Sequence, residues 1–308
     1  MSVCSKFDVV IVGGGPAGMA AALWCDELGL SSCLLERNDA RGGQLAWIHN
    51  PIHNYPGAEF RDGAECLARL EDSLADRRFE FFSNIAVFSI QPETHSVVTS
   101  AGALSGEAIV IATGVRRREL GVPGEAEFHG KGILESGSRD RQLVRGLDVA
   151  VIGGGDAALE NALILAEFAN KVYLIHRRDQ FTARKEFVEA VTVSSNIEII
   201  LNANVERFGG DTDLEFLDLI PMDGSSRRLP IAKAIVRIGV VPNSELLADI
   251  AEMDERGYVK IDHLGRTSGK GIFAVGDVAN PVSPTLSTAV GSAATAVKSI
   301  AAFVRTSE

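Results

Sequence analysis

Cysteine is scarce in this sequence. The 308-residue chain contains four cysteines, Cys4, Cys25, Cys33 and Cys66, all within its first quarter. They form no Cys-x-x-Cys pair and match no metal-ligand spacing. We therefore expect no metal site, and we expect the four thiols to be reduced and mainly structural.

The chain also lacks a surplus of basic side chains. Its formal net charge of −11 argues against nonspecific binding to nucleic acids or to anionic membranes, because both require a basic surface. The N-terminal residues Met1–Lys6 contain no apolar signal core, and no run approaches the ~20 apolar residues of a membrane span. We expect a cytoplasmic protein without nucleic-acid or membrane partners.

One stretch, residues 7–18, organises the first part of the chain. The apolar strand Val9–Val12 leads into Gly13-x-Gly15-x-x-Gly18, and an alanine-rich helix follows to about residue 28. The first glycine permits a turn, the second lets the backbone approach a pyrophosphate, and the third lets the helix pack on the strand. The pattern predicts a dinucleotide site, although a tight strand-to-helix turn without nucleotide would have the same sequence.

Glu36 supports the dinucleotide interpretation. A second strand, about residues 30–36, ends in this acid, about 20 residues beyond the glycines, where a carboxylate accepts hydrogen bonds from an adenosine ribose. A surface glutamate at a strand end is the alternative. Further on, we expect an irregular loop over residues 41–57, a helix over 62–76, a meander of strands over 79–99 and a buried strand over 109–114.

A second glycine loop begins after the strand Val149–Ile152. It reads Gly153-x-Gly155-x-x-Ala158, and we expect a helix over residues 157–168 and a strand over 171–175. The sequence His176-Arg177-Arg178 follows in place of an acid. Arginines at this point suit the 2′-phosphate of NADP, so the pattern favours NADPH over NADH. An exposed basic strand end without nucleotide is the alternative.

The last part of the chain contains a further candidate for cofactor binding, Asp277. After a strand over residues 234–239, the segment from Thr267 delivers Asp277 to a turn, where its carboxylate can accept a hydrogen bond from a sugar-alcohol hydroxyl. A surface aspartate is the alternative. A helix rich in small residues is expected over 285–303.

Taken together, these motifs resemble the thioredoxin reductase family of flavoproteins. G-G-G-P-A-G, G-G-Q-L, N-Y-P-G, A-T-G, G-G-G-D-A-A, H-R-R-D-Q-F, I-G-V-V-P-N and G-I-F-A-V-G-D occur in the family's order along nearly the whole chain. The resemblance implies an α/β fold with two Rossmann-like domains and a homodimer. It also implies a discontinuous FAD domain, residues 1–115 and 243–308, with an NADPH domain inserted at 116–242.

The resemblance also implies which residues contact the two cofactors. For FAD they are Gly13, Gly15, Pro16, Ala17, Gly18, Glu36, Gly43, Gln44, Leu45, Asn54, Val87, Ala112, Gly276 and Asp277. For NADPH they are Gly153, Gly155, Asp156, Ala157, His176, Arg177, Arg178, Arg184 and Ile238.

The sequence departs from the family at its redox motif. Thioredoxin reductases carry Cys-x-x-Cys-Asp shortly before the second glycine loop, and this position corresponds without gaps to residues 136–140, Ser-Gly-Ser-Arg-Asp. Neither serine nor arginine forms a disulfide, so dithiol chemistry of the usual kind is excluded. Asp140 remains a candidate proton donor, with a simple loop aspartate as the alternative. Thr182 also replaces a family arginine, for which Arg184 is the candidate substitute.

Relatives without the cysteine pair include the thioredoxin-reductase-like ferredoxin-NADP and flavodoxin-NADP reductases. By this resemblance, the chain is an NADPH-dependent FAD oxidoreductase that reduces an external acceptor. A disulfide reductase that uses unconventional or partner thiols and a nucleotide sensor without turnover are the alternatives. An acidic ferredoxin or flavodoxin could dock on the arginines at 116–118, 139, 141 and 145 by charge complementarity. The alternative is that these arginines are solvated side chains near a nucleotide site.

Overall fold

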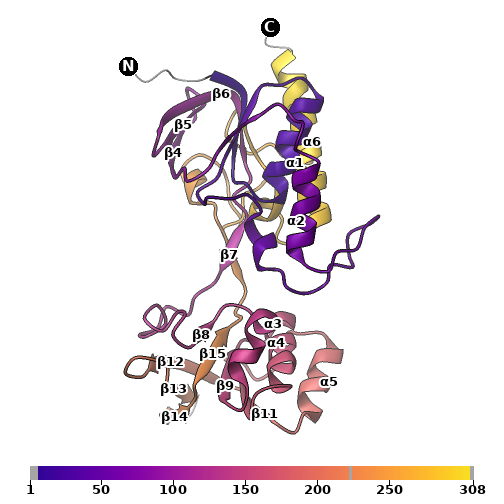
Figure 1. Ribbon diagram of the computed structural model, residues 1–308. Helices are drawn as coiled ribbons and strands as arrows, with labels where there is room; N and C mark the ends of the chain where they lie inside the picture. The colour runs from indigo at the N-terminus through magenta and orange to yellow at the C-terminus, as the bar shows by residue number, and fades with distance from the viewer. Residues whose placement is uncertain (1–5, 222–223, 306–308) are drawn as a thin grey trace. The chain divides into compact units, whose positions relative to one another are not determined.

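The computed structural model describes residues 6–221 and 224–305, which form two compact units (Figure 1). Unit 1 comprises residues 1–116 and 241–308, and unit 2 comprises residues 117–240. The chain passes between the units through β7 (Val115–Arg117) and β16 (Val240–Pro242), which pair with each other.

Unit 1 is built on a seven-stranded sheet with the order β3-β2-β1-β6-β5-β4, in which β17 also pairs with β6. Its strands are β1 (Lys6–Val12), β2 (Ser32–Leu35), β3 (Glu80–Phe82), β4 (Val87–Gln91), β5 (Ser96–Thr99), β6 (Gly102–Ile111) and β17 (Ile272–Ala274). Its helices are α1 (Pro16–Glu27), α2 (Gly63–Asp72) and α6 (Leu286–Arg305), with 3-10 turns η1 (Gly43–Trp47), η3 (Glu245–Leu247) and η4 (Gly276–Ala279).

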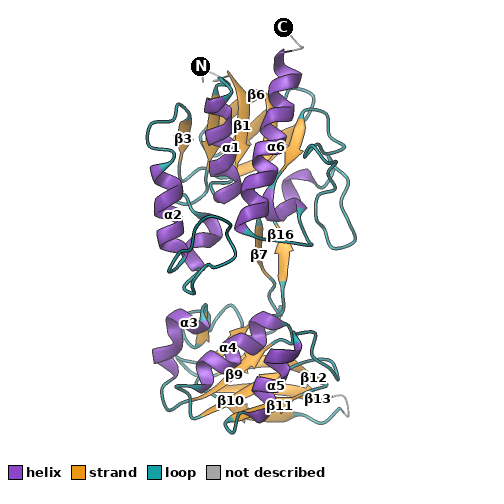
Figure 2. Cartoon of the chain, turned by 90° about the vertical axis from the view of Figure 1, so that its right-hand side faces the viewer, coloured by secondary structure: helices purple, strands orange, loops and turns teal. Residues whose placement is uncertain are grey.

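Alternation along β1 supplies both faces of this sheet with core residues. Val9 and Ile11 join the cluster beneath α1 and α6, whereas Val10 and Val12 join the cluster on the opposite face. Figure 2 shows α1 and α6 side by side over the sheet. α6 is long and apolar enough to span a membrane by length and composition, contrary to our expectation for this sequence. Its alanines instead pack in the core of unit 1.

Unit 2 is built on a five-stranded parallel sheet with the order β11-β10-β9-β15-β8. Its strands are β8 (Ile133–Leu134), β9 (Asp148–Ile152), β10 (Lys171–Ile175), β11 (Ile197–Ile200) and β15 (Lys233–Val236). An antiparallel sheet contains β12 (Ala203–Gly209), β13 (Phe216–Pro221) and β14 (Arg227–Pro230). The helical segments are α3 (Gly137–Asp140), η2 (Arg141–Val144), α4 (Asp156–Ala166) and α5 (Lys185–Val193).

The predicted strand–loop–helix units are present, but the meander expected over residues 79–99 is confirmed only for β4 and β5. β3 pairs in parallel with β2, and only β4 and β5 form an antiparallel hairpin that continues into β6. Asn84 adopts a left-handed backbone conformation, with φ of 57°, between β3 and β4. The chain therefore leaves one edge of the sheet and returns at the other. In addition, β6 begins well before residue 109, and β15 ends at Val236 rather than at residue 239.

Candidate cofactor sites

The first glycine loop connects β1 to α1. Gly13 has a φ of 111°, and a Cβ there would clash with the carbonyl oxygen of Ala112. A Cβ at Gly18 would clash with the carbonyl oxygen of Gly13. At Gly15 the space is open, because the nearest atom to an added Cβ is the Cα of Gly43, at 3.9 Å. Two glycines therefore serve packing, and the middle one leaves room for a ligand beside the backbone.

Pro16 and Ala17 begin α1 directly after this loop. Pro16 occupies the first helical turn, where its missing N–H costs no hydrogen bond. Ala17 is buried and lies against Gly276, at which a Cβ would approach that of Ala17 to 2.8 Å. Small residues therefore bring the start of α1 against η4, which carries Asp277.

Glu36 orders the loop from the end of β2. One oxygen of its buried carboxylate accepts the N–H of Gly14 at 2.8 Å. The other accepts the backbone N–H and the side-chain amide of Asn38, at 2.9 and 2.8 Å. A carboxylate oxygen has two acceptor positions, so the oxygen bonded to Gly14 retains one for a ribose hydroxyl.

The segment that begins at Gly42 lies against the same loop. The N–H of Gly42 donates to the carbonyl of Gly14 at 2.9 Å, and a Cβ at Gly43 would approach the Cα of Gly15 to 3.0 Å. Gln44 is exposed, and its amide donates to the carbonyl of Val115 at 2.6 Å. Leu45 is buried in a separate small cluster with Ile52, Phe60 and Cys66.

Asp277 has a half-buried carboxyl group for which no hydrogen-bond donor is present among residues 6–221 and 224–305. Burial raises the pKa of this carboxyl group above its ordinary value. Of the other residues implied for FAD, Ala112 is buried beside Gly13, Val87 begins β4, and Asn54 is exposed in a loop. Within the described chain, neither Val87 nor Asn54 has a hydrogen bond that links it to the glycine loop.

The second glycine loop repeats this arrangement between β9 and α4. Gly153 has a φ of 149°, and a Cβ there would clash with the carbonyl oxygen of Arg237. At Gly155 the nearest atom to an added Cβ is the hydroxyl of Thr182, at 3.9 Å. Thr182 itself is bound to this loop, because its backbone N–H donates to the carbonyl of Gly154 at 2.8 Å. Ala157 is exposed on the first turn of α4.

His176 lies directly beneath the second loop. It is buried, stacks on Phe181 with ring centroids 5.7 Å apart, and occupies the space that a Cβ at Gly154 would need. Burial lowers the pKa of His176, so the ring is neutral at pH 7. Its Nε2 has no hydrogen-bond partner within the described part of the chain. A buried ring nitrogen of this kind is costly unless a ligand pairs with it.

The arginines after β10 divide into two groups. Arg177 and Arg178 are exposed, and neither guanidinium has a protein partner among the described residues. Arg184 is engaged, because its Nε donates to Asp156 at 2.7 Å and its Nη1 lies 3.0 Å from Glu186. The two free guanidiniums are available to an anion. Ile238, which was also expected to contact NADPH, is half-buried after β15 and packs on the core.

Asp140, the expected proton donor, is held as a carboxylate. It accepts the N–H groups of Glu135 and Ser136, both at 3.1 Å, and is bonded by Arg139 at 2.6 and 3.0 Å. Burial opposes ionisation, but the bonds from Arg139 and from the backbone outweigh it and lower the pKa of Asp140. A low pKa disfavours proton donation at neutral pH, so the geometry supports the alternative, a structural aspartate.

The geometry of both glycine loops and of the polar groups near them fits two bound dinucleotides. Gly15 and Gly155 leave open space beside the N-termini of α1 and α4, where backbone N–H groups attract phosphate. The carboxylate of Asp277 lacks a donor, and Nε2 of His176 lacks a partner. A bound dinucleotide would supply a donor to Asp277, whereas the ring of His176 lies beneath the loop with Nε2 shielded from the open space.

Comparison with known proteins decides the family. Residues 7–299 match the family described as pyridine nucleotide-disulphide oxidoreductase. The chain belongs to this family. A thioredoxin reductase of Treponema pallidum is 33% identical over 98% of both chains. A 34.2 kDa protein in a rubredoxin operon of Clostridium pasteurianum is 30% identical over 92% of this chain and 93% of that protein. The crystal structure of Lactococcus lactis thioredoxin reductase matches with a TM-score of 0.86 and 31% identity, over 98% of this chain and 100% of that one.

These findings confirm the thioredoxin-reductase-like fold with its two Rossmann-like domains. The chain is thus a flavin-dependent pyridine nucleotide oxidoreductase, and the thioredoxin reductases of this family use FAD and NADPH.

The three cysteines within the described residues of this pyridine nucleotide-disulphide oxidoreductase are not in a reactive environment. Cys25, Cys33 and Cys66 are free and buried, and Cys4 lies outside the described residues. Burial raises the pKa of both Cys25 and Cys33 to about 12. Because the thiolate is the nucleophile, these two side chains are inert at physiological pH.

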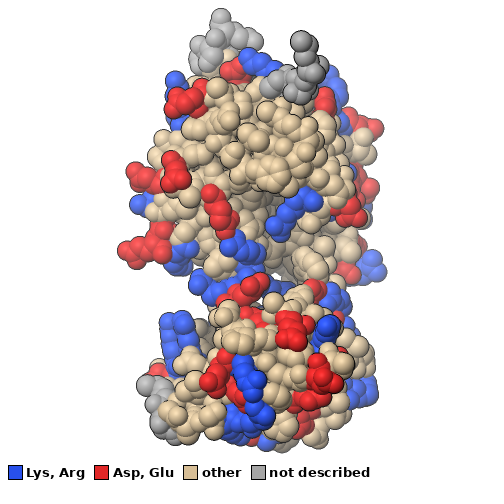
Figure 3. Space-filling view, turned by 90° about the vertical axis from the view of Figure 1, so that its left-hand side faces the viewer, with Lys and Arg blue, Asp and Glu red and all other residues tan. Residues whose placement is uncertain are grey.

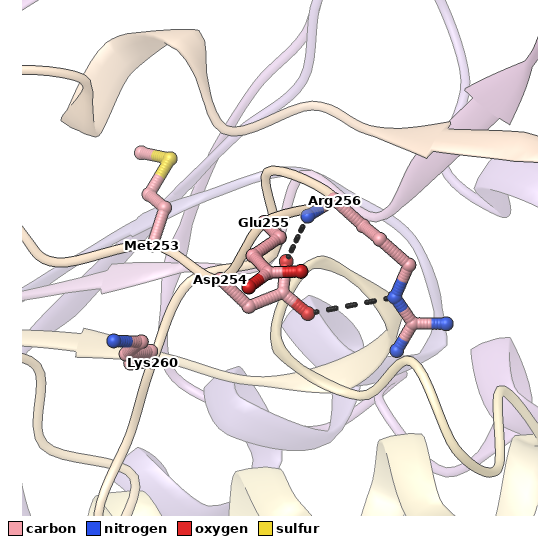
Figure 4. Close-up of a pocket in the computed structure, with 5 residues that line it drawn as sticks. All are labelled: Met253, Asp254, Glu255, Arg256 and Lys260. Atoms are coloured by element: carbon pink, nitrogen blue, oxygen red, sulfur yellow. Dashed lines mark hydrogen bonds and ion pairs between the residues drawn. The ribbon is translucent and has the colours of Figure 1, made fainter.

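Neither metal-ligating clusters nor the surface pocket adds a cofactor site among the described residues. No group of three metal-ligating side chains occurs within residues 6–221 and 224–305. A surface pocket, shown in Figure 4, is lined by Met253, Asp254, Glu255, Arg256 and Lys260. It surrounds a turn in which Asp254 accepts the N–H of Arg256 at 2.8 Å, and it contains none of the predicted site residues. On the face drawn in Figure 3, acidic and basic side chains are interspersed.

Several residues that shape these sites escaped sequence reasoning. Asn38 bonds the carboxylate of Glu36, which in turn binds the first loop, and the amide oxygen of Asn161 accepts the N–H of Gly137 at 3.0 Å. Asn38 could have been found, because it lies two residues beyond the predicted acid Glu36. The bond between Gly137 and Asn161 depends on tertiary packing and leaves no local sequence signal.

Proposed function

We propose that this oxidoreductase transfers electrons from NADPH through FAD to an acceptor outside the polypeptide, without a redox disulfide of its own. The observation that carries this proposal is the structure of residues 136–140. Ser136 caps α3, and Arg139 bridges two carboxylates, at the positions where thioredoxin reductases carry their cysteine pair. Nor does the sequence contain a Cys-x-x-Cys pair at any other position.

We assign FAD to unit 1 and NADPH to unit 2. In unit 1, the open backbone at Gly15 would face the pyrophosphate, Glu36 would accept a ribose hydroxyl, and Asp277 would accept a hydroxyl of the ribityl chain. Gly43 and Ala17 would close the loop from two sides through the packing described above. When bound, FAD supplies hydride acceptance from NADPH and release of electrons singly or in pairs.

In unit 2, Gly155 and the N-terminus of α4 would face the pyrophosphate of NADPH, and the neutral ring of His176 would support the loop from beneath. Arg177 and Arg178 would pair with the 2′-phosphate, since both are free within the described chain. Arg184 would act mainly by orienting Asp156, to which it is already bonded. We also propose a cytoplasmic homodimer, as the resemblance to thioredoxin reductases implies.

The overall reaction balances without any protein thiol. NADPH gives up a hydride, which carries two electrons and one proton, and a two-electron acceptor takes a second proton from solvent. The residues of this chain would bind and orient the two cofactors and exclude water, which accounts for much of the catalysis in hydride transfer. Asp140 would act as a structural anchor for residues 135–139 rather than as a proton donor.

An anaerobic acceptor screen tests the proposal. FAD-loaded protein mixed with NADPH should lose its flavin absorbance, and an added acceptor should restore it. Ferredoxin, flavodoxin, thioredoxin and small disulfides would be compared in separate reactions. Reoxidation by ferredoxin, by flavodoxin or by an acceptor without sulfur supports the proposal. Reoxidation by disulfides alone would establish disulfide reduction, and a flavin that NADPH does not bleach would establish a sensor.

A further inference from the structure

Two arginines of unit 2 donate to the same backbone oxygen. Arg117 ends β7, and Arg237 directly follows β15. Nη1 of Arg117 and Nη2 of Arg237 both donate to the carbonyl of Glu135, the latter at 2.6 Å. Nη1 of Arg237 also donates to the carbonyl of Val236 at 2.9 Å. The two guanidinium groups are therefore neighbours.

The positive charge of this pair is not neutralised by a direct ion pair. Among residues 6–221 and 224–305, no carboxylate oxygen lies within 4.0 Å of either guanidinium. The two nearby acids are committed to Arg139, which lies 3.1 Å from Glu135 and 2.6 Å from Asp140. Arg117, Arg139 and Arg237 thus outnumber Glu135 and Asp140 by one charge.

The pair is also partly desolvated. Burial lowers the pKa of Arg237 to about 10, and the adjacent charge of Arg117 contributes to this shift. Burial lowers the pKa of Arg117 as well. Both groups remain charged at pH 7. Neighbouring like charges that have lost water favour a bound anion, and the planar fork of arginine matches the oxygens of a carboxylate, sulfonate or phosphate.

The pair remains within reach of a ligand. Arg117 is exposed and Arg237 is half-buried, and the bonds described above use only a minority of their N–H donors. Glu135, whose carbonyl they share, directly precedes Ser136, the position of the family's first cysteine. The carbonyl of Arg237 packs against Gly153 of the second glycine loop. The arginines thus lie at the end of the sheet that carries the loop proposed for NADPH.

We propose that Arg117 and Arg237 bind the oxyanion of a small-molecule electron acceptor, such as its carboxylate or sulfonate, next to the segment that replaces the redox disulfide. This inference rests on the proposed function, because it requires an external acceptor. Convergence of two half-desolvated guanidiniums on one oxygen favours a single compact oxyanion over the broad acidic surface of a protein partner.

A matched pair of quinones tests this inference on the full-length, FAD-loaded protein. After anaerobic reduction by NADPH, stopped-flow traces would measure reoxidation by 1,4-naphthoquinone-2-sulfonate and by uncharged 1,4-naphthoquinone. In the double variant R117Q/R237M, the apparent Kd for the sulfonate should rise about tenfold or more, because charge-assisted hydrogen bonds are lost. The uncharged quinone should respond equally in both proteins. The neighbouring variant R118Q, which removes one positive charge outside the pair, should match the parent, and the single variant R117Q provides the comparison at equal charge.

A second measurement separates this inference from the proposed function. Isothermal titration calorimetry of benzenesulfonate against the oxidised protein requires no electron transfer. The parent and R118Q should bind, and R117Q/R237M should not. The single variant R117Q retains the backbone bonds of Arg237, so it provides the comparison if the double variant is misfolded by circular dichroism. Equal responses to both quinones, a change in the KM for NADPH alone, or an effect confined to ferredoxin or flavodoxin would overturn the inference.

Discussion

The hydroxyl oxygen of Ser136 accepts a hydrogen bond from the backbone N–H of Arg139 at 3.3 Å. By the resemblance to thioredoxin reductases, these two residues occupy the positions of the redox cysteines. A helix-capping hydroxyl and a guanidinium that bridges Glu135 and Asp140 have no redox chemistry. The segment is therefore held together by polar contacts within unit 2, and the function proposed above requires electron transfer that does not pass through it.

Removal of this cap should affect stability and leave turnover intact. Ser136→Ala should lower the free energy of unfolding by about 1 kcal/mol, because the N–H of Arg139 loses its acceptor. Urea denaturation followed by circular dichroism would measure the change, and Ser136→Thr, which retains a hydroxyl, is the control. A large fall in the rate of NADPH-dependent acceptor reduction by Ser136→Ala would show that the serine takes part in the chemistry.

The glycines of the first loop should respond in opposite ways to the same substitution. Gly15→Ala places a methyl group in open space, so the protein should fold with near-parental stability and lose FAD. Gly18→Ala places it against the carbonyl of Gly13, so the fold itself should be destabilised, by about 1–3 kcal/mol. Flavin content after purification and thermal unfolding without added FAD would measure both effects. Retention of FAD by Gly15→Ala would contradict the assignment of the loop.

Arg177 and Arg178 should set the preference for NADPH. Replacement of both by Gln should raise the KM for NADPH about tenfold or more, because two charge-assisted contacts to the 2′-phosphate are lost. The KM for NADH, which has no such phosphate, should change little. Steady-state assays with both nucleotides would show this. Lys185→Gln, which removes a nearby exposed charge, is the control, and a parallel loss with NADH would indicate a different role.

Asp277 should make unfolding of the FAD-free protein depend on pH. Its folded-state pKa is raised by burial, so the folded state binds this proton more tightly than the unfolded state does. Stability is therefore lost as pH rises from the unfolded pKa through the raised folded pKa. Asp277→Asn should raise the Tm of the FAD-free protein at pH 7 and weaken FAD binding. The gain in Tm should vanish at a pH where the carboxyl is protonated in both states, and a gain that persists there would exclude this cause.

The buried thiols of Cys25 and Cys33 should not react with alkylating reagents during turnover. Because burial holds the pKa values of Cys25 and Cys33 near 12, iodoacetamide at pH 8 should leave both unlabelled in the native protein. Mass spectrometry of protein trapped during NADPH-driven turnover would quantify labelling, with urea-unfolded protein as the positive control. Turnover-dependent labelling of either cysteine would refute a mechanism without protein thiols.

The features that could be predicted from the sequence depend on local residue patterns. Both glycine loops, the acid Glu36 and the alternation of strands and helices depend on residues close together in the chain, and the structure contains each of them. The features that could not be predicted depend on contacts between residues far apart in the sequence. The parallel pairing of β3 with β2 and the convergence of Arg117 on Arg237 join segments that carry no mutual signal in sequence. The role of Asp140 was open for a different reason, because its donors lie within five residues of it but turn toward the carboxylate only in the folded segment.

The discontinuity of unit 1 bears on the order in which the protein acquires its structure during synthesis. β17 and α6 are synthesised after unit 2, yet they pack against β6 and α1, which precede unit 2 in the chain. Synthesis of unit 2 is finished before β17 and α6 are made, so unit 2 can fold while unit 1 is still incomplete. Until α6 is synthesised, the alanine-lined surface of α1 lacks its partner helix, so apolar surface of the nascent first half stays exposed.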